Sequence, residues 1–288
     1  MRLLHLADLH LGWQPGDWPP ERAVERRHRR DGVLARIVDT ALAEEAQLVV
    51  VAGDLFDDFD PPEELVDTVL AELARLERGG ALPVTVPGNH DELTYSGSVY
   101  RRRRADWPGL LVSEPLPAHL TSLDLAGQRV HLYGMAFTGG VTPQDRPVRE
   151  FPRLEEPGVH VAAFHGSLDT AGGQRTLSLD SDALAAARYH YVALGHVHDP
   201  LRHEFPAGPA AYPGAPEALA VGDGGCGTVA LVDFDGERAV ARDIPVSVQP
   251  VRDTALDLTP VDDVAEIDAF MAALADGDAV QHVRLGGA

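Results

Sequence analysis

The stretch RLLHLADLHLG, residues 2–12, is a short apolar run that ends abruptly in two polar residues, Asp8 and His10. A continuous apolar run of this length is typical of a strand that is buried on both faces. Two later runs, residues 47–52 and 82–86, have the same character and are also followed directly by polar side chains. Strands of this kind belong to parallel sheets that helices cover on both faces. The pattern therefore predicts an α/β fold.

The segments between these runs have the periodicity of helices. Residues 21–46 place apolar side chains at intervals of three and four, and residues 63–78 do the same. The second segment follows Pro61-Pro62 and precedes Gly79-Gly80, which are typical residues at the beginning and just after the end of a helix. The first third of the chain therefore predicts the order βαβαβ.

The second half of the chain predicts further strands, some of them in hairpins. Ala126-Gly127 and Asp235-Gly236 are turn signals between short apolar runs. The expected strands are residues 120–125, 129–134, 159–164, 189–194, 228–233 and 238–244. We expect two mixed sheets packed face to face and flanked by helices. A final βαβ pattern over residues 254–285 suggests a division into a main domain, residues 1–250, and a partial cap, residues 251–288.

The composition excludes several classes of function. The chain has 288 residues, its 24 basic side chains are all arginine, and Cys226 is the only cysteine. Without lysine there is no Walker-A loop or Schiff base, and a single cysteine excludes a disulfide framework or a thiolate zinc site. The net charge of −21 disfavours a protein that coats nucleic acid. No apolar run is long enough to cross a membrane, so we expect a cytoplasmic protein without a membrane partner.

Side chains that can bind metals follow five of the expected strands. They are Asp8 and His10, Asp54, Asn89 beside His90, His165, and His196 with His198. Sites in α/β sheets form beyond the carboxyl ends of the strands, so we expect these groups to meet at one edge. Carboxylate, imidazole and amide ligands suit manganese, iron, zinc or cobalt. The other histidines, His5 and His190 among them, follow no such pattern, and we expect them to be structural.

In their order, these blocks resemble the motifs of the calcineurin-like metallophosphoesterase superfamily across residues 1–250. The blocks are DLH at 8–10, GD at 53–54, GNHD at 88–91, HG at 165–166 and GHVH at 195–198. One block alone means little, whereas five in order, each after a strand, are a specific signal. The flanking segments resemble the SbcD/YhaO-type branch of DNA-repair exonucleases. These segments are LHLADLHLG at 4–12, GDLFD at 53–57, YVALGHVH at 191–198 and YPGAPE at 212–217.

The resemblance implies a four-layer sandwich with a two-metal site. Asp8, His10 and His198 would hold one divalent ion, Asn89, His165 and His196 the other, and Asp54 would bridge them. Manganese is the expected metal, with iron, zinc, cobalt or magnesium as alternatives.

The resemblance also implies roles in catalysis. A metal-bound hydroxide would attack the phosphodiester. His90 would stabilise the transition state or protonate the leaving oxygen. Asp57 and Asp91 would orient histidines from outside the ligand set.

By the same resemblance, the chain would be a manganese-dependent exonuclease or endonuclease of double-strand-break repair. Its substrates would be DNA ends, hairpins or single strands. An SMC-type ATPase similar to SbcC and a second copy of the chain would be its partners. The branch continues into a full capping domain and ATPase-docking helices, whereas residues 251–285 resemble only the first βαβ unit of such a cap.

Two arginine-rich segments are candidates for contact with the DNA backbone. The first contributes Arg22, Arg26, Arg27, Arg29 and Arg30, and the second is Arg101–Arg104. The alternative for both is a solvated surface on which arginine pairs with carboxylates. Trp13 and Trp18 either stack on an unpaired base or pack against the helix that follows them, and we expect packing.

Two other functions would use the same residues. A hydrolase of small phosphoesters needs the same ligands, because they bind metal and phosphate and not a particular leaving group. The negative charge favours this alternative slightly, and the flanking segments favour the nuclease. A catalytically silent DNA-end or ATPase-binding module is the second alternative. It would be expected to lose ligands, whereas all seven and His90 are present.

Overall fold

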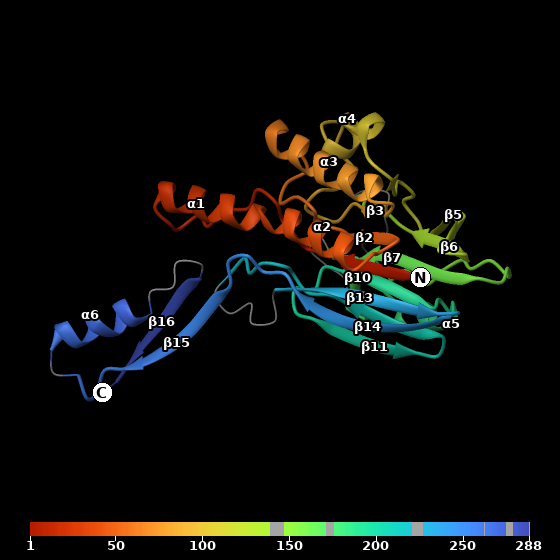
Figure 1. Ribbon diagram of the computed structural model, residues 1–288. Coiled ribbons are helices and arrows are strands. Elements are labelled where there is room, and N and C mark those ends of the chain that lie inside the picture. Colours follow the sequence, from red (N-terminus) through yellow and green to blue (C-terminus); the bar gives the residue numbers. More distant parts are fainter. Residues whose placement is uncertain (139–146, 171–175, 221–226, 262, 275–278, 288) are drawn as a thin grey trace.

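Two six-stranded sheets pack face to face and form the main body of the molecule (Figure 1). The computed structural model describes residues 1–138, 147–170, 176–220, 227–261, 263–274 and 279–287. Cys226 therefore lies outside the described residues. No helix within the described ranges is long and apolar enough to cross a bilayer.

The first sheet has the strand order β14-β13-β1-β2-β3-β4. Its members are β1 (Arg2–Leu6), β2 (Leu48–Ala52), β3 (Leu82–Val86), β4 (Leu110–Leu111), β13 (Thr228–Asp235) and β14 (Arg238–Pro245). β1 to β4 are parallel, and the β13–β14 hairpin joins β1 antiparallel. The apolar runs are buried as expected. The hairpin comes from the second half of the chain but extends the first sheet, because β13 pairs with β1.

The helices α2 (Val33–Ala43) and α3 (Glu63–Arg78) cover the outer face of the first sheet, and α1 (Pro20–Asp31) precedes α2 and extends beyond the sheet (Figure 1). The prediction of one helix over residues 21–46 is wrong, because the helix is interrupted at Gly32 and the second part ends at Ala43. Glycine has a low helix propensity, and the two parts also pack differently. α2 buries an apolar stripe, whereas α1 buries only Ala23, Arg26 and Arg30.

The second sheet has the order β11-β12-β10-β7-β6-β5. Its members are β5 (Ala118–Leu125), β6 (Gln128–Gly134), β7 (Val159–His165), β10 (Tyr191–Gly195), β11 (Leu201–Phe205) and β12 (Gly208–Tyr212). β6, β7, β10 and β12 are parallel to one another. The edge strands are antiparallel, with β5 paired with β6 and β11 with β12. Both sheets are thus mixed, as predicted.

Short elements complete the main body, and the largest core cluster lies between the sheets and under α2 and α3. The short elements are α4 (Val99–Arg102), the 3-10 turn Arg104–Asp106, β8 (Ser167–Leu168), β9 (Ser178–Leu179) and α5 (Ser181–Ala186). A smaller apolar cluster covers the outer face of the second sheet. This arrangement gives the α/β sandwich that the sequence predicts.

The last elements form a separate projection (Figure 1). β15 (Val251–Asp257) and β16 (Val280–Gly286) pair in parallel as a two-stranded sheet, connected through α6 (Val264–Ala273). This is the βαβ unit that the pattern predicts. None of the described residues from 251 to 287 is buried. The projection therefore has little core of its own.

Candidate metal centre

The carboxyl ends of five strands bring the expected metal-binding residues together. Asp8, Asp54 and Asn89 follow β1, β2 and β3 of the first sheet, while His165 ends β7 and His196 follows β10 of the second sheet. β1, β2 and β3 are parallel to one another, as are β7 and β10. The carboxyl ends of these strands therefore lie at one edge of the sandwich, where the two sheets meet.

Asp54 lies between the two groups of expected ligands. Its Oδ2 is 3.3 Å from His165 Nε2 and 3.7 Å from His10 Nε2. Its Oδ1 accepts a hydrogen bond of 2.9 Å from the backbone amide of His90. One carboxylate thus faces an imidazole from each group, which is the position that a bridging ligand requires.

Asn89, His165 and His196 form one group. Asn89 Oδ1 is 2.9 Å from His165 Nε2 and 3.0 Å from His196 Nδ1. His165 Nδ1 donates to the carbonyl oxygen of Ala52 at 2.9 Å, which leaves Nε2 as the nitrogen that faces the group. Two imidazole nitrogens and an amide oxygen converge here.

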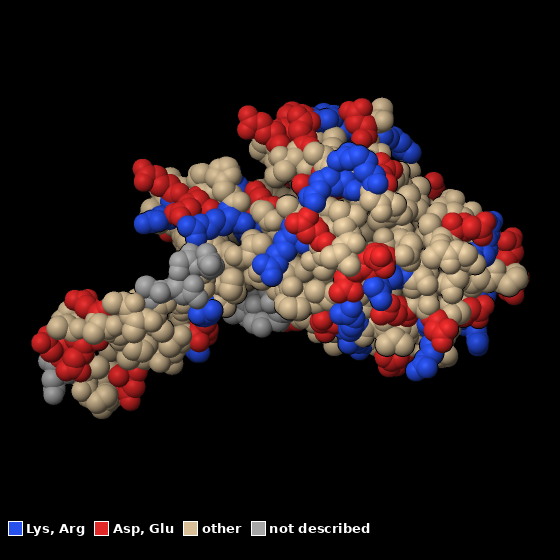
Figure 2. All heavy atoms as spheres, viewed as in Figure 1, with Lys and Arg blue, Asp and Glu red and all other residues tan. Residues whose placement is uncertain are grey.

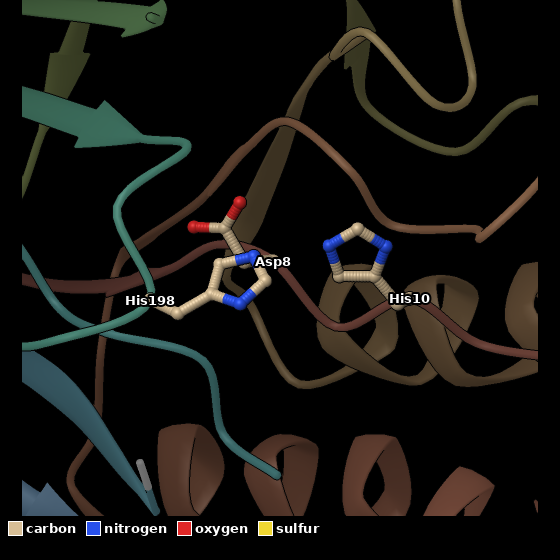
Figure 3. Close-up of side chains that lie close together, drawn as sticks. All are labelled: Asp8, His10 and His198. Carbon is tan, nitrogen blue, oxygen red and sulfur yellow. The ribbon is translucent and has the colours of Figure 1, made fainter. Parts of the chain in front are cut away.

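Asp8, His10 and His198 form the other group (Figure 3). One possible ligand atom from each of them lies within 4.8 Å of the others, and the same holds for Asp8, Asp54 and His165. Both oxygens of Asp8 accept the backbone amide of His196 at 3.0 Å. Asp8 therefore contacts the loop that follows β10 as well as its own loop.

His10 gives a direct test of whether these residues fit a metal ion. Its side chain is 1% exposed, and its Nδ1 is 3.1 Å from Asp57 Oδ1. Its Nε2 is buried and has no hydrogen-bond partner in the described part of the chain. A buried polar atom without a partner costs free energy, and coordination to a metal would satisfy it. The donor set and this unpaired nitrogen fit a divalent ion.

Positive φ occurs at eight non-glycine residues that the structure describes, and four of them are expected ligands. Asp8, His10, Asp54 and His196 have φ values of 56°, 45°, 50° and 102°. Residues other than glycine rarely adopt positive φ, and such strain gathers at functional sites that the surrounding structure holds in place. Four of the seven expected ligands carry this strain.

Two glycines of the motifs are required by close packing. A Cβ atom on Gly88 would lie 2.1 Å from Asp54 Oδ1, and one on Gly195 would lie 1.9 Å from the carbonyl oxygen of Ala52. Neither site leaves room for a side chain. The glycines in GNHD and GHVH therefore allow the strand ends to approach one another.

The pKa values describe a buried pair of opposite charges, Asp54 and His165. Burial opposes ionisation of Asp54, but the neighbouring His165 outweighs it and lowers the pKa of Asp54. Burial favours neutral His165, yet Asp54 raises the pKa of His165 to about 9. His196 is different, because burial and His165 together lower its pKa to about 4. Asp54 thus stays negatively charged at the point where cations would bind.

His90 and Asp57 occupy the open side of the centre. The side chain of His90 is 39% exposed, in contrast to that of His10. Its Nδ1 lies 3.1 Å from the carbonyl oxygen of Asp57 and 3.6 Å from Asp57 Oδ1. Asp57 therefore contacts both His10 and His90.

Asp91 has a different role from the one expected. Its Oδ1 accepts the amide of Gly88 at 2.7 Å, and its Oδ2 accepts the amide of Phe56 at 3.1 Å and the Tyr100 hydroxyl at 2.6 Å. In the described structure its hydrogen bonds go to these groups and not to a histidine. Asp91 joins the loops after β2 and β3, so the expectation that it orients a histidine is wrong.

Two residues near the centre were not identified from the sequence. Thr176 Oγ1 is 3.0 Å from His196 Nε2, and Tyr100 holds Asp91. Neither residue belongs to a motif, and each meets its partner only through tertiary packing. Local sequence carries no signal for them.

The arginine-rich segment of α1 divides into buried and exposed residues. Arg26 is 4% exposed and Arg30 is 0% exposed, so neither is available to DNA and the expectation for these two is wrong. Arg22 and Arg29 are exposed and pair with Glu25, and Arg27 reaches Gln14 at 3.5 Å. Only these three arginines of the segment remain candidates for DNA contact.

The second arginine segment and Trp13 make contacts within the protein, as the alternatives to DNA contact predict. Arg102 and Arg103 form ion pairs with Glu63, and Arg103 also pairs with Asp67. Trp13 packs against the guanidinium of Arg30, with 5.4 Å between the ring centre and Cζ. On the face shown in Figure 2, basic atoms are interspersed with acidic ones.

Comparison with known proteins identifies a family model and several relatives. The model for calcineurin-like phosphoesterases matches residues 1–200. The SbcD subunit of the nuclease SbcCD of Rhodobacter capsulatus is 30% identical in an alignment of 309 positions, which covers 88% of this chain and 73% of that protein. DNA double-strand break repair protein Mre11 of Methanopyrus kandleri is 29% identical over 235 residues. These cover 76% of this chain but only 49% of that protein, so the chain spans about half the length of this relative.

Two further comparisons extend this result. The uncharacterized metallophosphoesterase YhaO of Bacillus subtilis is 25% identical, with 76% of this chain and 53% of that protein covered. A crystal structure of a dimetal phosphatase from Danio rerio superposes with a TM-score of 0.50 and 13% identity, covering 85% of this chain and 98% of that one. This structural likeness supports the fold alone.

Proposed function

Because the chain belongs to the calcineurin-like phosphoesterase family, and is thus a metal-dependent phosphoester hydrolase, we propose that it is a DNA nuclease of double-strand-break repair. One observation carries the proposal. Six other candidate ligands from the ends of the two sheets lie around Asp54, in the order that the resemblance to repair nucleases implies. Relatives named as repair nucleases at 29–30% identity support the choice of DNA.

The proposed metal centre assigns each ligand a place. Asp8, His10 and His198 would hold one ion, Asn89, His165 and His196 would hold the other, and Asp54 would bridge them. The short distances around Asp54 and Asn89 support this division. Manganese is the proposed metal, although iron, zinc, cobalt and magnesium suit the same hard and borderline donors. Two bound divalent ions supply Lewis-acid activation of water and of the phosphodiester.

His90 acts on the substrate from the open side of the centre. Asp57 binds its Nδ1, so Nε2 is the nitrogen available to a phosphate oxygen. From that position His90 stabilises charge on the phosphate or gives a proton to the leaving oxygen. Asp57 fixes the orientation of the ring and also that of His10. The exposed Arg22 and Arg29 and the half-buried Arg27 would contact the DNA backbone without reading its sequence.

The partners are proposed on the resemblance, and they are an SMC-type ATPase similar to SbcC and a second copy of the chain. The cytoplasm is the proposed location. Hydrolysis of a small phosphodiester is the alternative activity, because the same centre serves it and the net charge of −21 weakens binding to DNA.

The test compares two kinds of substrate under manganese and under magnesium. End-labelled duplex, hairpin and single-stranded DNA are incubated with the protein beside bis-p-nitrophenyl phosphate. We expect manganese-dependent cleavage of DNA that Asp54→Ala abolishes. Turnover of the small ester without cleavage of any DNA would favour the alternative, and absence of turnover on all substrates would favour a silent binding module.

A further inference from the structure

Arg30, at the end of α1, is a buried cation that contacts the first metal-binding loop. It is 0% exposed, and its Nη1 donates to the carbonyl oxygen of His10 at 2.7 Å. Its Nη2 donates to the carbonyl oxygen of Leu9 at 2.6 Å. The next residue, Asp31, accepts the amide of Gly12 at 3.0 Å. Two consecutive residues of α1 thus bind three backbone groups of residues 9–12.

The loop that Arg30 contacts needs such support. Asp8 and His10 have positive φ, a conformation that residues other than glycine adopt only where the surrounding structure holds them in it. The amides of Asp8 and His10 donate to the carbonyl oxygens of Gly53 and Asp54 at 3.1 and 2.9 Å. The loop after β2 therefore holds the amide side of this turn. Arg30 holds its carbonyl side.

Burying the charged guanidinium of Arg30 costs free energy, because the charge loses its contact with water. Burial lowers the pKa of Arg30 to about 10, which reflects the cost of keeping the charge out of water. An apolar side chain of similar size would avoid that cost. A planar guanidinium, however, presents paired donors in a rigid fork that can bind two adjacent carbonyl oxygens at once. The end of α1 also favours a positive charge, because helix carbonyls point toward it.

We infer that Arg30 is a positioning residue of the metal centre, which holds Asp8 and His10 in the strained conformation that lets them share one ion. The inference rests on the proposed two-metal site. It assigns to the arginine-rich segment a role inside the protein, at a residue that does not touch substrate.

Arg26 provides a matched control one turn earlier in the same helix. It is also buried, and its guanidinium also binds carbonyl oxygens, those of Gln249 and Ala218, both at 3.0 Å. Its third acceptor is the side chain of Gln249. None of these acceptors belongs to a metal-binding loop. Loss of Arg26 removes a buried cation without releasing the turn at His10.

The experiment measures Mn²⁺ binding by isothermal titration to the metal-free full chain. The variants are Arg30→Met, Arg30→Lys and Arg26→Met, and thermal unfolding in EDTA checks that each is folded. We expect Arg30→Met to bind Mn²⁺ about 10-fold or more weakly, as changes to residues behind metal ligands do. Arg30→Lys, which keeps the charge but lacks the fork, should fall between Arg30→Met and wild type. Arg26→Met should bind as wild type does.

Each other outcome has a definite meaning. Wild-type Mn²⁺ affinity in folded Arg30→Met would overturn the inference, and so would an equal loss in Arg26→Met. If Arg30→Met does not fold, Arg30→Lys decides, and wild-type affinity in that variant would overturn the inference. Failure of the wild-type chain itself to bind Mn²⁺ would instead contradict the proposed manganese centre, and the inference with it.

Discussion

Asp54 is the residue through which the two groups of candidate ligands meet. Asp54→Asn keeps the shape of the side chain but removes the charge that faces His10 and His165. We expect it to lower turnover of bis-p-nitrophenyl phosphate more than about 100-fold, together with metal occupancy. Turnover and Mn²⁺ titration measure the two effects separately.

His90→Asn is the matched contrast to this variant. His90 is not a proposed ligand, so we expect the variant to keep its metal while turnover falls by about 10²–10⁴-fold. Metal loss in this variant, or full activity in either one, would contradict the assignment of roles.

His5 contacts the second sheet from the first, and its burial should make the stability of the fold depend on pH. It is buried on β1, with its Nδ1 2.9 Å from the Tyr191 hydroxyl on β10, and burial lowers its pKa to about 3. The unfolded chain binds a proton at His5 below pH 6.5 and the folded chain does not. The contribution of neutral His5 to the free energy of unfolding is therefore complete above pH 6.5 and is lost as the pH falls toward 3. At pH 5 the free energy of unfolding is lower by roughly 2 kcal/mol.

Urea unfolding at pH 7 and pH 5 measures this effect. His5→Phe removes the titrating group, so we expect its free energy of unfolding to fall less over this range than that of wild type. An equal fall in both proteins would show that His5 carries no part of the acid sensitivity.

At the scale of elements, the β13–β14 hairpin depends on the conformation of one glycine. Gly236 lies in its turn with φ of 59°, and the space where a Cβ would lie is open. Gly236→Ala should therefore destabilise the chain by about 1 kcal/mol through backbone strain alone. Chemical denaturation measures it. Gly97→Ala is the control, because Gly97 also has open space but no positive φ, and an equal loss there would exclude this explanation.

The five strands that precede the candidate ligands were predictable because their signal is local, whereas β11 and β12 were not predicted. Each apolar run is followed directly by its polar block, so the runs located the strand ends and all seven candidate ligands. The sheet that a hairpin joins is not a local property, and the pairing of β13 with β1 connects residues more than 220 positions apart. This is why the place of that hairpin could not be predicted.

The burial of α1 shows a second limit. Ala23, Arg26 and Arg30 are spaced by three and four residues, which places them on one side of a helix. This spacing was a signal for burial, but charge at two of the three positions concealed it. The acceptors of Arg26 include Gln249, 223 positions away. Only the folded chain shows that carbonyl oxygens accept hydrogen bonds from the guanidinium groups of both Arg26 and Arg30.

At the scale of the whole molecule, we expect residues 1–250 to fold without the projection. The described residues after 250 contribute no buried side chain, and Gln249, which binds Arg26, is kept in the shorter chain. The shorter chain should unfold within a few degrees of the full chain and bind Mn²⁺ with equal affinity. Thermal unfolding and titration test this, and a large loss of either property would mean that the projection supports the main domain.

The candidate ligands of the metal centre come in nearly equal shares from the two sheets. Those from Asp8 to Asn89 follow strands of the first sheet, and His165, His196 and His198 belong to the second. Ions bound between them would cross-link the two sheets at one end of the sandwich. By mass action, an ion at 100 times its dissociation constant adds about 2.7 kcal/mol to the stability of the fold. Removing the ions would therefore loosen the contact between the sheets at the same moment as it stops catalysis.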